Sequence, residues 1–467
     1  MNKILFSFVA LIILTWSSLY GQKDVSSAGS FIDNGTISYS NNGSALVERH
    51  LSQDCWHGYC IPVNSTNTQP FLNLQLLAKW YDEPEHTYHS VVNPAGDSIL
   101  NRIMLGYLVY SNSSLTGNST IRVTGSLNTG PIGFSMTNHI GPSGPDGWNL
   151  IGNPFPSAIN WLLPGFTLSE VDPTIYVFHP ETGNYFYWNR HDQLHTTGAS
   201  SIIASQQGFY MHANVAGSQS GNVSLDNSIR LHSSQPFYKD DTLMNEQLIL
   251  TVRGNSFTDE SRIRFDSATT VLFDPDHDAY KLDGADDAPQ LYSVLPDSTK
   301  VALNARPWGG YYTVIPLGFH IDDATTDTLI ASNLESFQPG IVIWLEDKKT
   351  GTWTDLTLTP EYIFNSLPGD NPDRFLLHFS NPYTGFTART KGFIQIYSFD
   401  ASVYVMNRTI GNSAGDIFIY DLIGRLLFKD KLKNIGLNKF EPGVNEGYYI
   451  VKVITDTNAA TQKVFLK

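Results

Sequence analysis

Charged residues are scarce in this sequence, and positively charged residues are the scarcer kind. Asp, Glu, Lys and Arg make up 16% of the 467 residues, and 44 acidic residues against 29 basic ones give a formal net charge of −15. A nucleic-acid-binding protein needs a basic face for phosphates, and an anionic membrane surface attracts the same kind of face. The composition therefore argues against both kinds of partner. An acidic surface is compatible with calcium or a cationic partner, and it also favours solubility.

Long apolar runs are missing after the first sixteen residues. The chain begins with the charged Met1–Lys3, continues with the apolar run Ile4–Trp16, and reaches a small residue at Gly21. That order is typical of a secretory signal peptide, and the run is too short to span a bilayer. We expect cleavage after Gly21, and because Gln22 follows rather than cysteine, no lipoprotein anchor. The predicted route is Sec export into the periplasm, and no transmembrane segment is expected.

Cysteine occurs only twice, at Cys55 and Cys60. In an oxidising compartment a lone pair is expected to form a disulfide. On an extended strand the two residues would lie about 16 Å apart, beyond bridging distance, so the bond requires a turn centred on His57 and Gly58. A metal site made of Cys55, His57 and Cys60 is the alternative, although no fourth ligand is evident nearby.

Motifs of the common enzyme classes are also absent. The sequence contains no zinc-protease helix motif, phosphate-binding loop or dinucleotide fingerprint. The segment Gly411–Gly415 spells the nucleophile-elbow pattern, but a strand follows it where that motif needs a helix, so we predict a turn. Folding can still assemble the paired carboxylates of a glycoside hydrolase from distant positions in the sequence. The prediction is therefore a protein that is not an enzyme, with a glycoside hydrolase-like enzyme as the alternative.

The abundant residues predict an all-β protein. Aromatic residues reach 12%, and Thr, Val, Gly, Asn and Pro are frequent, which favours short strands joined by turns. We expect tandem antiparallel β-sandwich domains that end in a small Ig-like sandwich. The predicted organisation is a signal peptide (1–21), an N-terminal β-rich region (22–236, with a possible split near 137–147), a second β-sandwich (237–397) and a C-terminal domain (398–467).

Two internal stretches combine unusual residues. The block from Gly147 to Trp161 places a strand, a rigid double-proline turn and the aromatic residues Phe155 and Trp161 in sequence, and we expect these aromatics to pack in the core rather than to form a sugar-binding platform. The segment Asp82–His89 gathers carboxylates and imidazoles, which is compatible with a metal site and, more simply, with a solvated loop.

A third stretch, from Phe273 to Asp287, carries alternating carboxylates. Carboxylate oxygens are ligands for calcium, but the EF-hand pattern fails because Ala279 replaces the required Gly and Ala285 the required Glu. A calcium loop of another kind and a solvated acidic loop both remain open. The candidate ligands are Asp274, Asp276, Asp278 and Asp283.

The last seventy residues form a distinct segment. From residue 402 onward there are nine Lys and Arg against six Asp and Glu, so this segment is basic while the rest of the chain is acidic. Alternation of apolar residues predicts about five to seven short strands, with a tight turn at Gly424 and Arg425. The residues that mark the segment are Tyr420, Asp421, Gly424, Arg425, Gly447, Tyr448, Lys463 and Lys467.

These blocks resemble the C-terminal sorting domain, of a type A-like pattern, found in type IX secretion cargo of Bacteroidetes bacteria. The usual Pro-Asn-Pro at the start of that domain is replaced here by Phe399–Tyr404. The Gly147–Trp161 block is similar to a recurrent segment of adhesin-like surface proteins with such domains. The resemblance implies recognition by the type IX machinery, release or attachment to surface lipopolysaccharide, and an adhesin-like or structural body with a glycan or protein ligand. A calcium-dependent carbohydrate-binding module is the alternative.

Overall fold

The computed structural model describes most of the chain between residues 23 and 467. The described residues are 23–25, 45–64, 67–92, 102–114, 120–141, 144–145, 147–215, 220–232, 246–309, 312–380, 394–407, 415–432, 436–456 and 458–467. The predicted signal peptide (1–21) and residues 411–414 of the elbow-like pattern lie outside them.

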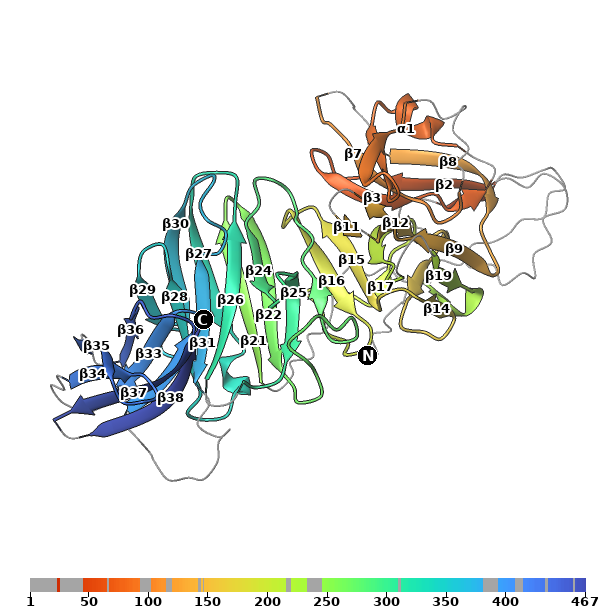
Figure 1. The fold of residues 1–467 in the computed structure, drawn as a ribbon. Coiled ribbons are helices and arrows are strands. Elements are labelled where there is room, and N and C mark those ends of the chain that lie inside the picture. The colour runs from red at the N-terminus through yellow and green to blue at the C-terminus, as the bar shows by residue number, and fades with distance from the viewer. Residues whose placement is uncertain are drawn as a thin grey trace, which may run out of the picture. The chain divides into compact units, whose positions relative to one another are not determined.

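The prediction of an all-β protein is confirmed (Figure 1). The helical elements of the described residues are three short ones: α1 (Gln69–Asn73), η2 (Asn227–Ile229) and η3 (Leu334–Ser336). None of the helices in the described part of the chain has the length and hydrophobicity needed to cross a bilayer. Most strand pairs among the described residues are antiparallel, while β1 with β2 and β22 with β25 are parallel.

The chain divides into two compact units. The first contains residues 1–178 and 198–239, and the second contains residues 179–197 and 240–467. The predicted N-terminal region (22–236) included residues 179–197, whereas in the structure these residues belong to the second unit. Residues on both sides of the predicted split at 137–147 lie in the first unit.

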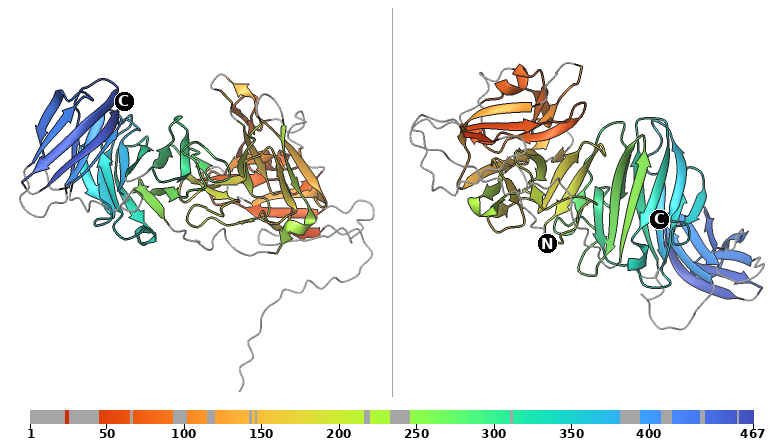
Figure 2. Two further views of the ribbon diagram at one scale, coloured as in Figure 1. Left: turned by 60° about the horizontal axis from the view of Figure 1, so that its bottom comes forward. Right: turned by 180° about the vertical axis from the view of Figure 1, so that it is seen from behind.

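The first unit is built from several small sheets, drawn from red to yellow-green in Figures 1 and 2. Four-stranded sheets have the orders β1-β2-β8-β4 and β3-β7-β5-β6, and the strands β12-β18-β15 belong to a third four-stranded sheet, of order β12-β18-β15-β16. Shorter sheets join β17-β13-β20, β14-β19-β9 and β10-β11. The strands are β1 (Lys23–Val25), β2 (Ala45–His50), β3 (Trp56–Cys60), β4 (Val63–Asn64), β5 (Leu77–Asp82), β6 (Thr87–Ser90), β7 (Gly106–Tyr110), β8 (Thr120–Leu127), β9 (Ile132–Thr137), β10 (Ile140–Gly141), β11 (Gly144–Pro145), β12 (Trp148–Gly152), β13 (Ala158–Asn160), β14 (Phe166–Ser169), β15 (Thr174–His179), β17 (Ile202–Ile203), β18 (Gly208–His212), β19 (Ser220–Leu225) and β20 (Arg230–Leu231).

The Gly147–Trp161 block packs in this unit as predicted. Strand β12 pairs with β18, and Phe155 and Trp161 beyond it are fully buried. Their rings therefore belong to the core and form no exposed platform for sugar rings. The buried side chain of Asn153 stabilises the turn at 153–157, because its Oδ1 accepts from the backbone N–H of Phe155 and its Nδ2 donates to the carbonyl of Ser157.

The second unit contains one large sheet of eleven strands. Its order is β29-β28-β31-β26-β24-β25-β22-β21-β27-β30, and β23 pairs with β25. The strands of this unit, with β16 and those of the C-terminal domain, are β16 (Asn184–Asn189), β21 (Gln247–Gly254), β22 (Phe257–Phe265), β23 (Ala279–Tyr280), β24 (Gln290–Val294), β25 (Lys300–Arg306), β26 (Tyr312–His320), β27 (Thr325–Ser332), β28 (Val342–Asp347), β29 (Thr352–Asp355), β30 (Glu361–Ser366), β31 (Phe375–Ser380), β32 (Ile394–Phe399), β33 (Ser402–Asn407), β34 (Gly415–Tyr420), β35 (Leu426–Lys431), β36 (Gly436–Phe440), β37 (Gly447–Thr455) and β38 (Ala459–Leu466).

The large sheet curls around a single apolar core. Leu345 of β28 and Phe364 of β30 come from opposite ends of the strand order, yet both belong to the same buried cluster. Alternation along the strands supplies this core, since successive side chains point to opposite faces of a sheet. In β21, for example, Leu248, Leu250 and Val252 are fully buried.

The C-terminal domain is a small sandwich of two sheets, β32-β33-β36 and β35-β34-β37-β38. Its own buried cluster joins residues of both sheets, among them Val403 and Val451. Strand β37 alternates as predicted, with Tyr449, Val451 and Val453 buried and Tyr448 exposed. The domain begins at β32, so the predicted boundary at 398 falls inside its first strand.

Candidate functional site

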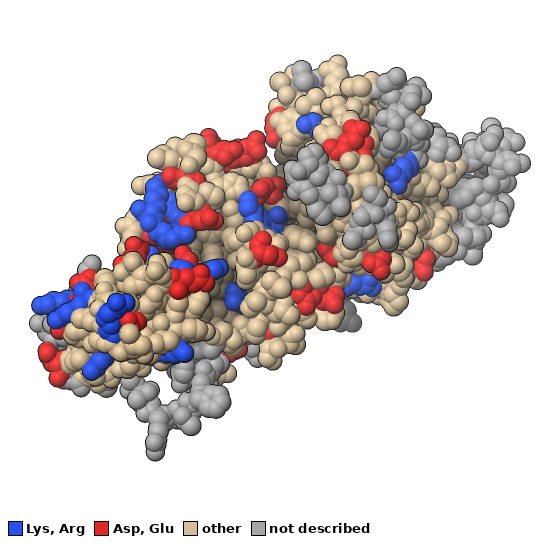
Figure 3. Space-filling model, viewed as in Figure 1, with Lys and Arg blue, Asp and Glu red and all other residues tan. Residues whose placement is uncertain are grey.

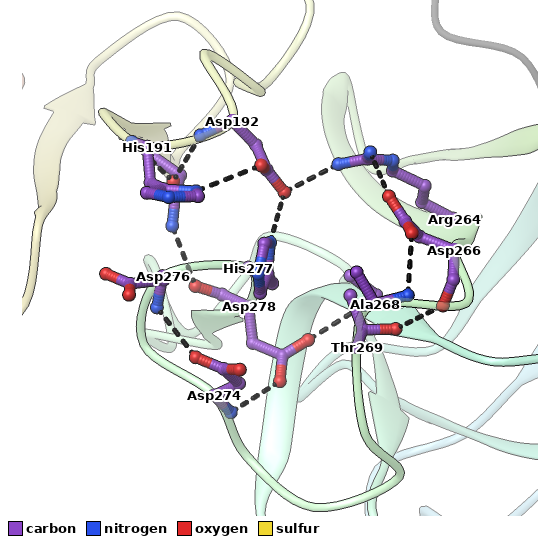
Figure 4. A network of polar contacts seen from close by, with 12 residues as sticks. His191, Asp192, Arg264, Asp266, Ala268, Thr269, Asp274, Asp276, His277 and Asp278 are labelled. Carbon is purple, nitrogen blue, oxygen red and sulfur yellow. Dashed lines mark hydrogen bonds and ion pairs between the residues drawn. The ribbon is translucent and has the colours of Figure 1, made fainter.

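Two segments of the second unit meet in a polar network, shown in Figure 4. One is the turn at 189–192, directly after β16, and the other is the loop at 274–278, directly before β23. Asp278 shapes the loop, because its carboxylate accepts from the backbone N–H groups of Asp274 (2.8 Å) and Ala305 (2.7 Å). Burial raises the pKa of Asp278 to about 7, although these two hydrogen bonds act in the opposite direction.

Asn189 holds the two segments together. Its side chain is fully buried, and Nδ2 donates to the carbonyls of Pro275 (3.0 Å) and Asp278 (3.3 Å). Its Oδ1 accepts from the backbone N–H groups of His191 (3.0 Å) and Asp192 (3.2 Å). One amide therefore sets the shape of the turn and its position beside the loop.

Asp192 is the centre of the network. Its Oδ1 lies 3.2 Å from Nδ1 of His191, and its Oδ2 lies 2.8 Å from Nδ1 of His277. The same Oδ2 accepts from Arg264 at 2.5 Å, and Arg264 also donates to Asp266 at 2.5 Å. Burial alone would lower the pKa of His277, but the hydrogen bond and charge of Asp192, with the charge of Asp274, outweigh it and raise that pKa.

The four carboxylates predicted to bind calcium do not converge. Asp278 is used by two backbone N–H groups, and Oδ1 of Asp274 accepts from the backbone N–H of Asp276 at 3.1 Å. Asp283 is exposed beyond β23. None of the four belongs to a group of three or more ligand atoms within 4.8 Å among the described residues. The local hydrogen bonds of the loop, which sequence spacing does not reveal, account for the difference.

The group that does converge is His191, Asp192 and His277, whose ligand atoms all lie within 4.8 Å of one another. Sequence reasoning missed it. Asp192 and His277 are 85 positions apart, and no spacing rule links them. The available signal was the His-Asp pair after an aromatic strand, together with a lone His inside the acidic loop.

A second group of this kind lies in the Asp82–His89 segment of the first unit. Nε2 of His89 is 3.0 Å from Glu85 and 3.7 Å from Asp82. Glu83 is not part of this group: it is buried, and its carboxylate bonds to the backbone N–H and Nδ1 of His139. The segment is therefore an ordered turn between β5 and β6.

The predicted disulfide is absent, and this corrects the sequence prediction. Both cysteines are free, because β3 runs extended from Trp56 to Cys60 and includes the His57 and Gly58 positions where the bond required a turn. Sγ of Cys55 lies 3.3 Å from Nε2 of His57, whereas Cys60 is buried, and burial raises the pKa of its thiol. The three residues of the alternative metal site are not among the groups that could hold an ion in the described part of the chain.

The C-terminal motif residues form an exposed, hydrogen-bonded turn between β34 and β35. Oδ1 of Asp421 accepts from the backbone N–H of Arg425 at 2.8 Å, and Oδ2 accepts from its Nε at 3.1 Å. Gly424 has φ +88°, a conformation that favours glycine. The side chain of Arg425 is 74% exposed, and Tyr420 precedes the turn in β34.

The other motif residues lie on the outer face of the neighbouring strands. Gly447 opens β37, and the ring of the exposed Tyr448 lies 4.3 Å from Nζ of Lys463 on β38. The backbone N–H of Lys467 donates to the carbonyl of Asp400 at 3.1 Å. On the face shown in Figure 3, Lys and Arg side chains gather over this domain.

Glu346 joins the large sheet to the C-terminal domain. Its buried carboxylate accepts from His378 at 2.9 Å on the neighbouring strand β31, and from Lys439 at 3.0 Å on β36. Around this carboxylate, the rings of Tyr397 and Tyr404 stack with their centroids 5.1 Å apart, and the ring of Tyr312 stacks on that of Tyr397 with a centroid distance of 4.1 Å. The domain is therefore docked on the body through a buried aromatic and ionic contact.

A family model covers the body of the chain but stops before the C-terminal domain. The model, described as "Domain of unknown function (DUF8693)", matches residues 17–379. The chain belongs to the DUF8693 family. No curated protein matches it. The DUF8693 region includes every strand from β1 to β30 and almost all of β31, and it ends before β32.

Proposed function

We propose that this protein is exported to the outer cell surface or the medium by the type IX machinery, and that its C-terminal domain (394–467) is the sorting domain. The observation that carries the proposal is the domain itself. It has its own core, lies outside the DUF8693 match, and presents the Asp421–Arg425 turn on its surface. A separate module attached to a family body is what a sorting domain requires.

The DUF8693 body is proposed to be an adhesin-like or structural β module with a glycan or protein ligand. Its all-β architecture supports this role. The predicted route is Sec export with removal of residues 1–21, followed by passage across the outer membrane. Afterwards the body is released or attached to surface lipopolysaccharide.

The test is the location of the protein in a Bacteroidetes host that carries the type IX machinery. Cell fractionation is expected to find the full chain outside the outer membrane and the chain without residues 394–467 in the periplasm. Because the deletion also uncovers the aromatic side chains packed against β32 and β33, a misfolded body would give the same result. Point variants that leave the docking contact intact are therefore needed.

Arg425→Ala supplies that variant, and Lys452→Ala is its matched control. Both side chains are exposed, and both substitutions remove one positive charge from the C-terminal domain. We expect Arg425→Ala to accumulate in the periplasm and Lys452→Ala to be exported. The proposal would be overturned if the chain without residues 394–467 still reached the cell surface. It would also be overturned if Arg425→Ala and Lys452→Ala were both exported as well as the wild type. The intact mass of the exported protein should correspond to a start at Gln22 and an end near β32.

A further inference from the structure

We propose that His191, Asp192 and His277 form a binding site for a transition metal ion, with Zn²⁺ as the ion to test. The inference is independent of the export route. Two imidazoles and one carboxylate are a ligand set that zinc accepts, whereas calcium prefers six to eight oxygen ligands. The sequence analysis predicted only oxygen ligands, for calcium, in the 274–278 loop. In the structure the ligand group combines the carboxylate of Asp192 with the imidazole nitrogens of His191 and His277.

The distances fit a small tetrahedral ion. Zinc binds nitrogen and carboxylate oxygen at about 2.0–2.2 Å, so neighbouring ligand atoms of a tetrahedral site lie about 3.3 Å apart. Here Oδ1 of Asp192 is 3.2 Å from Nδ1 of His191, and Oδ2 of the same carboxylate is 2.8 Å from Nδ1 of His277, so each oxygen lies beside one imidazole. All three ligand atoms lie within 4.8 Å of one another, so small side-chain rotations are enough to surround an ion.

The ligands are held in place before any ion binds. Asn189 bonds the turn that carries His191 and Asp192 to the loop that carries His277. The loop is in turn anchored by Asp278 to the backbone of β25 at Ala305. Metal sites gain affinity when surrounding hydrogen bonds orient their ligands, and such a frame is present here.

The surrounding charge suits a divalent cation. Asp192, Asp266 and Asp274 supply three negative charges around the site, and Arg264 supplies one positive charge. Arg264 donates one hydrogen bond to Asp192 and one to Asp266. The first bond orients the ligand carboxylate, and the carboxylate of Asp266 balances part of the positive charge of Arg264. To bind the ion, each Nδ1 must offer its lone pair, so a neutral ring carries its proton on Nε2 and a protonated ring loses one proton to solvent.

The site is open on one side. The side chain of His191 is 53% exposed, whereas those of Asp192 and His277 are 10% and 16% exposed. Three protein ligands leave a fourth position of a tetrahedral ion for water or for a donor atom of a bound molecule. An ion held in this way can contact a ligand of the body directly.

The experiment uses the chain from residue 22 to residue 467, stripped with EDTA and titrated with ZnCl₂ in a calorimeter. We expect one equivalent to bind, and millimolar CaCl₂ not to displace it. His191→Gln and His277→Gln should each weaken binding at least about tenfold, since disturbing even a supporting residue typically costs 10–100-fold. Co²⁺ in place of Zn²⁺ should show the intense visible bands of tetrahedral coordination in the wild-type chain.

The second cluster provides the matched control. Glu85→Gln/His89→Gln removes two potential ligands from the first unit, and it should leave zinc binding at this site unchanged. Because His191 is exposed, unfolding of His191→Gln in EDTA should match the wild type, which separates loss of a ligand from loss of the fold. Absence of zinc binding at about 100 μM, affinity unchanged in both histidine variants, or binding lost only in the control variant would overturn the proposal.

Discussion

Nζ of Lys439 lies 3.0 Å from Oε1 of Glu346, although the two residues are 93 positions apart and belong to different sheets. Glu346 is buried and also accepts from His378. The carboxylate is therefore a shared partner for a cation of the C-terminal domain and an imidazole of the large sheet. Breaking this contact should loosen the docking of the domain.

Glu346→Gln is expected to lower the free energy of unfolding by about 1–3 kcal/mol, because the buried groups around it lose a charged partner. Urea denaturation measures the change, and limited proteolysis of the native protein should become faster. Glu441→Gln is the control. Glu441 lies 3.4 Å from the same Lys439 but is 72% exposed, so its effect should stay below about 0.5 kcal/mol. Equal effects of the two variants would contradict a special role for the buried carboxylate.

Acid should weaken the same contact. Burial lowers the pKa of His378 and outweighs the hydrogen bond from its ring to Glu346. Burial acts to raise the pKa of Glu346, but the hydrogen bonds and charges of His378 and Lys439 outweigh it and lower that pKa. Both groups bind protons less readily in the folded state than in the unfolded chain. The free energy of unfolding should therefore fall as the pH drops below about 6.5, and again below about 4.5.

Denaturation curves between pH 4 and pH 8 measure this dependence. His378→Gln should flatten the upper step and retain the lower one, since it removes only the imidazole. The hydroxyls of Tyr397 and Tyr404 also face this pair, but burial raises their pKa values, so they do not titrate in this range. If the upper step persists in His378→Gln, a group other than His378 causes it.

Removing one partner of the buried Asp347–Arg374 pair should strongly destabilise the large sheet. Arg374 donates to both carboxylate oxygens, at 3.1 and 2.7 Å, and both side chains are almost completely buried. Asp347→Ala is expected to cost about 3–5 kcal/mol because it leaves a buried charge without its partner. Lys349→Ala, which breaks the more exposed pair with Asp370, should cost less than about 1 kcal/mol.

A double variant separates the two parts of that cost. Asp347→Leu/Arg374→Met removes both charges, so it should recover much of the stability lost in Asp347→Ala. Guanidinium denaturation of the three variants provides the comparison. A double variant as unstable as the single one would mean that the pair is needed for shape rather than for charge balance.

Asn189 should act on the proposed metal site without touching the ion. Asn189→Ala removes the bonds that join the turn and the loop, and it should lower zinc affinity about 10–100-fold. Asn255→Ala is a suitable control, since this exposed Asn also donates to a loop carbonyl, that of Asp287. Calorimetric titration with ZnCl₂ measures both. Unchanged affinity in Asn189→Ala would contradict the supporting role.

The thiols give a direct check of the cysteine correction. Protein unfolded without reductant should react with two equivalents of a thiol reagent, and the native protein should react at Cys55 first because Cys60 is buried and its thiol pKa is raised. A reduced sample provides the reference count. No reactive thiol in the unfolded, unreduced protein would restore the predicted disulfide.

Local sequence patterns determined much of this protein. The all-β class follows from composition and alternation, because side chains that alternate along a strand sort themselves between core and solvent, as they do in β37. The turn at Asp421–Arg425 was equally predictable, since a short-range hydrogen bond and a glycine at positive φ shape it within a few residues. Burial of Phe155 and Trp161 followed from their size and apolarity.

Only the tertiary structure decided the rest. Whether Cys55 and Cys60 lie on a turn or a strand depends on the pairing of β3 with β7, not on the residues between them. The Asp274–Asp278 loop uses its carboxylates for its own backbone, while His277 meets Asp192 from a segment 85 positions earlier. Glu346 finds Lys439 in the same way. Contacts between residues so far apart in the sequence depend on how whole sheets pack, and local sequence patterns do not predict that packing.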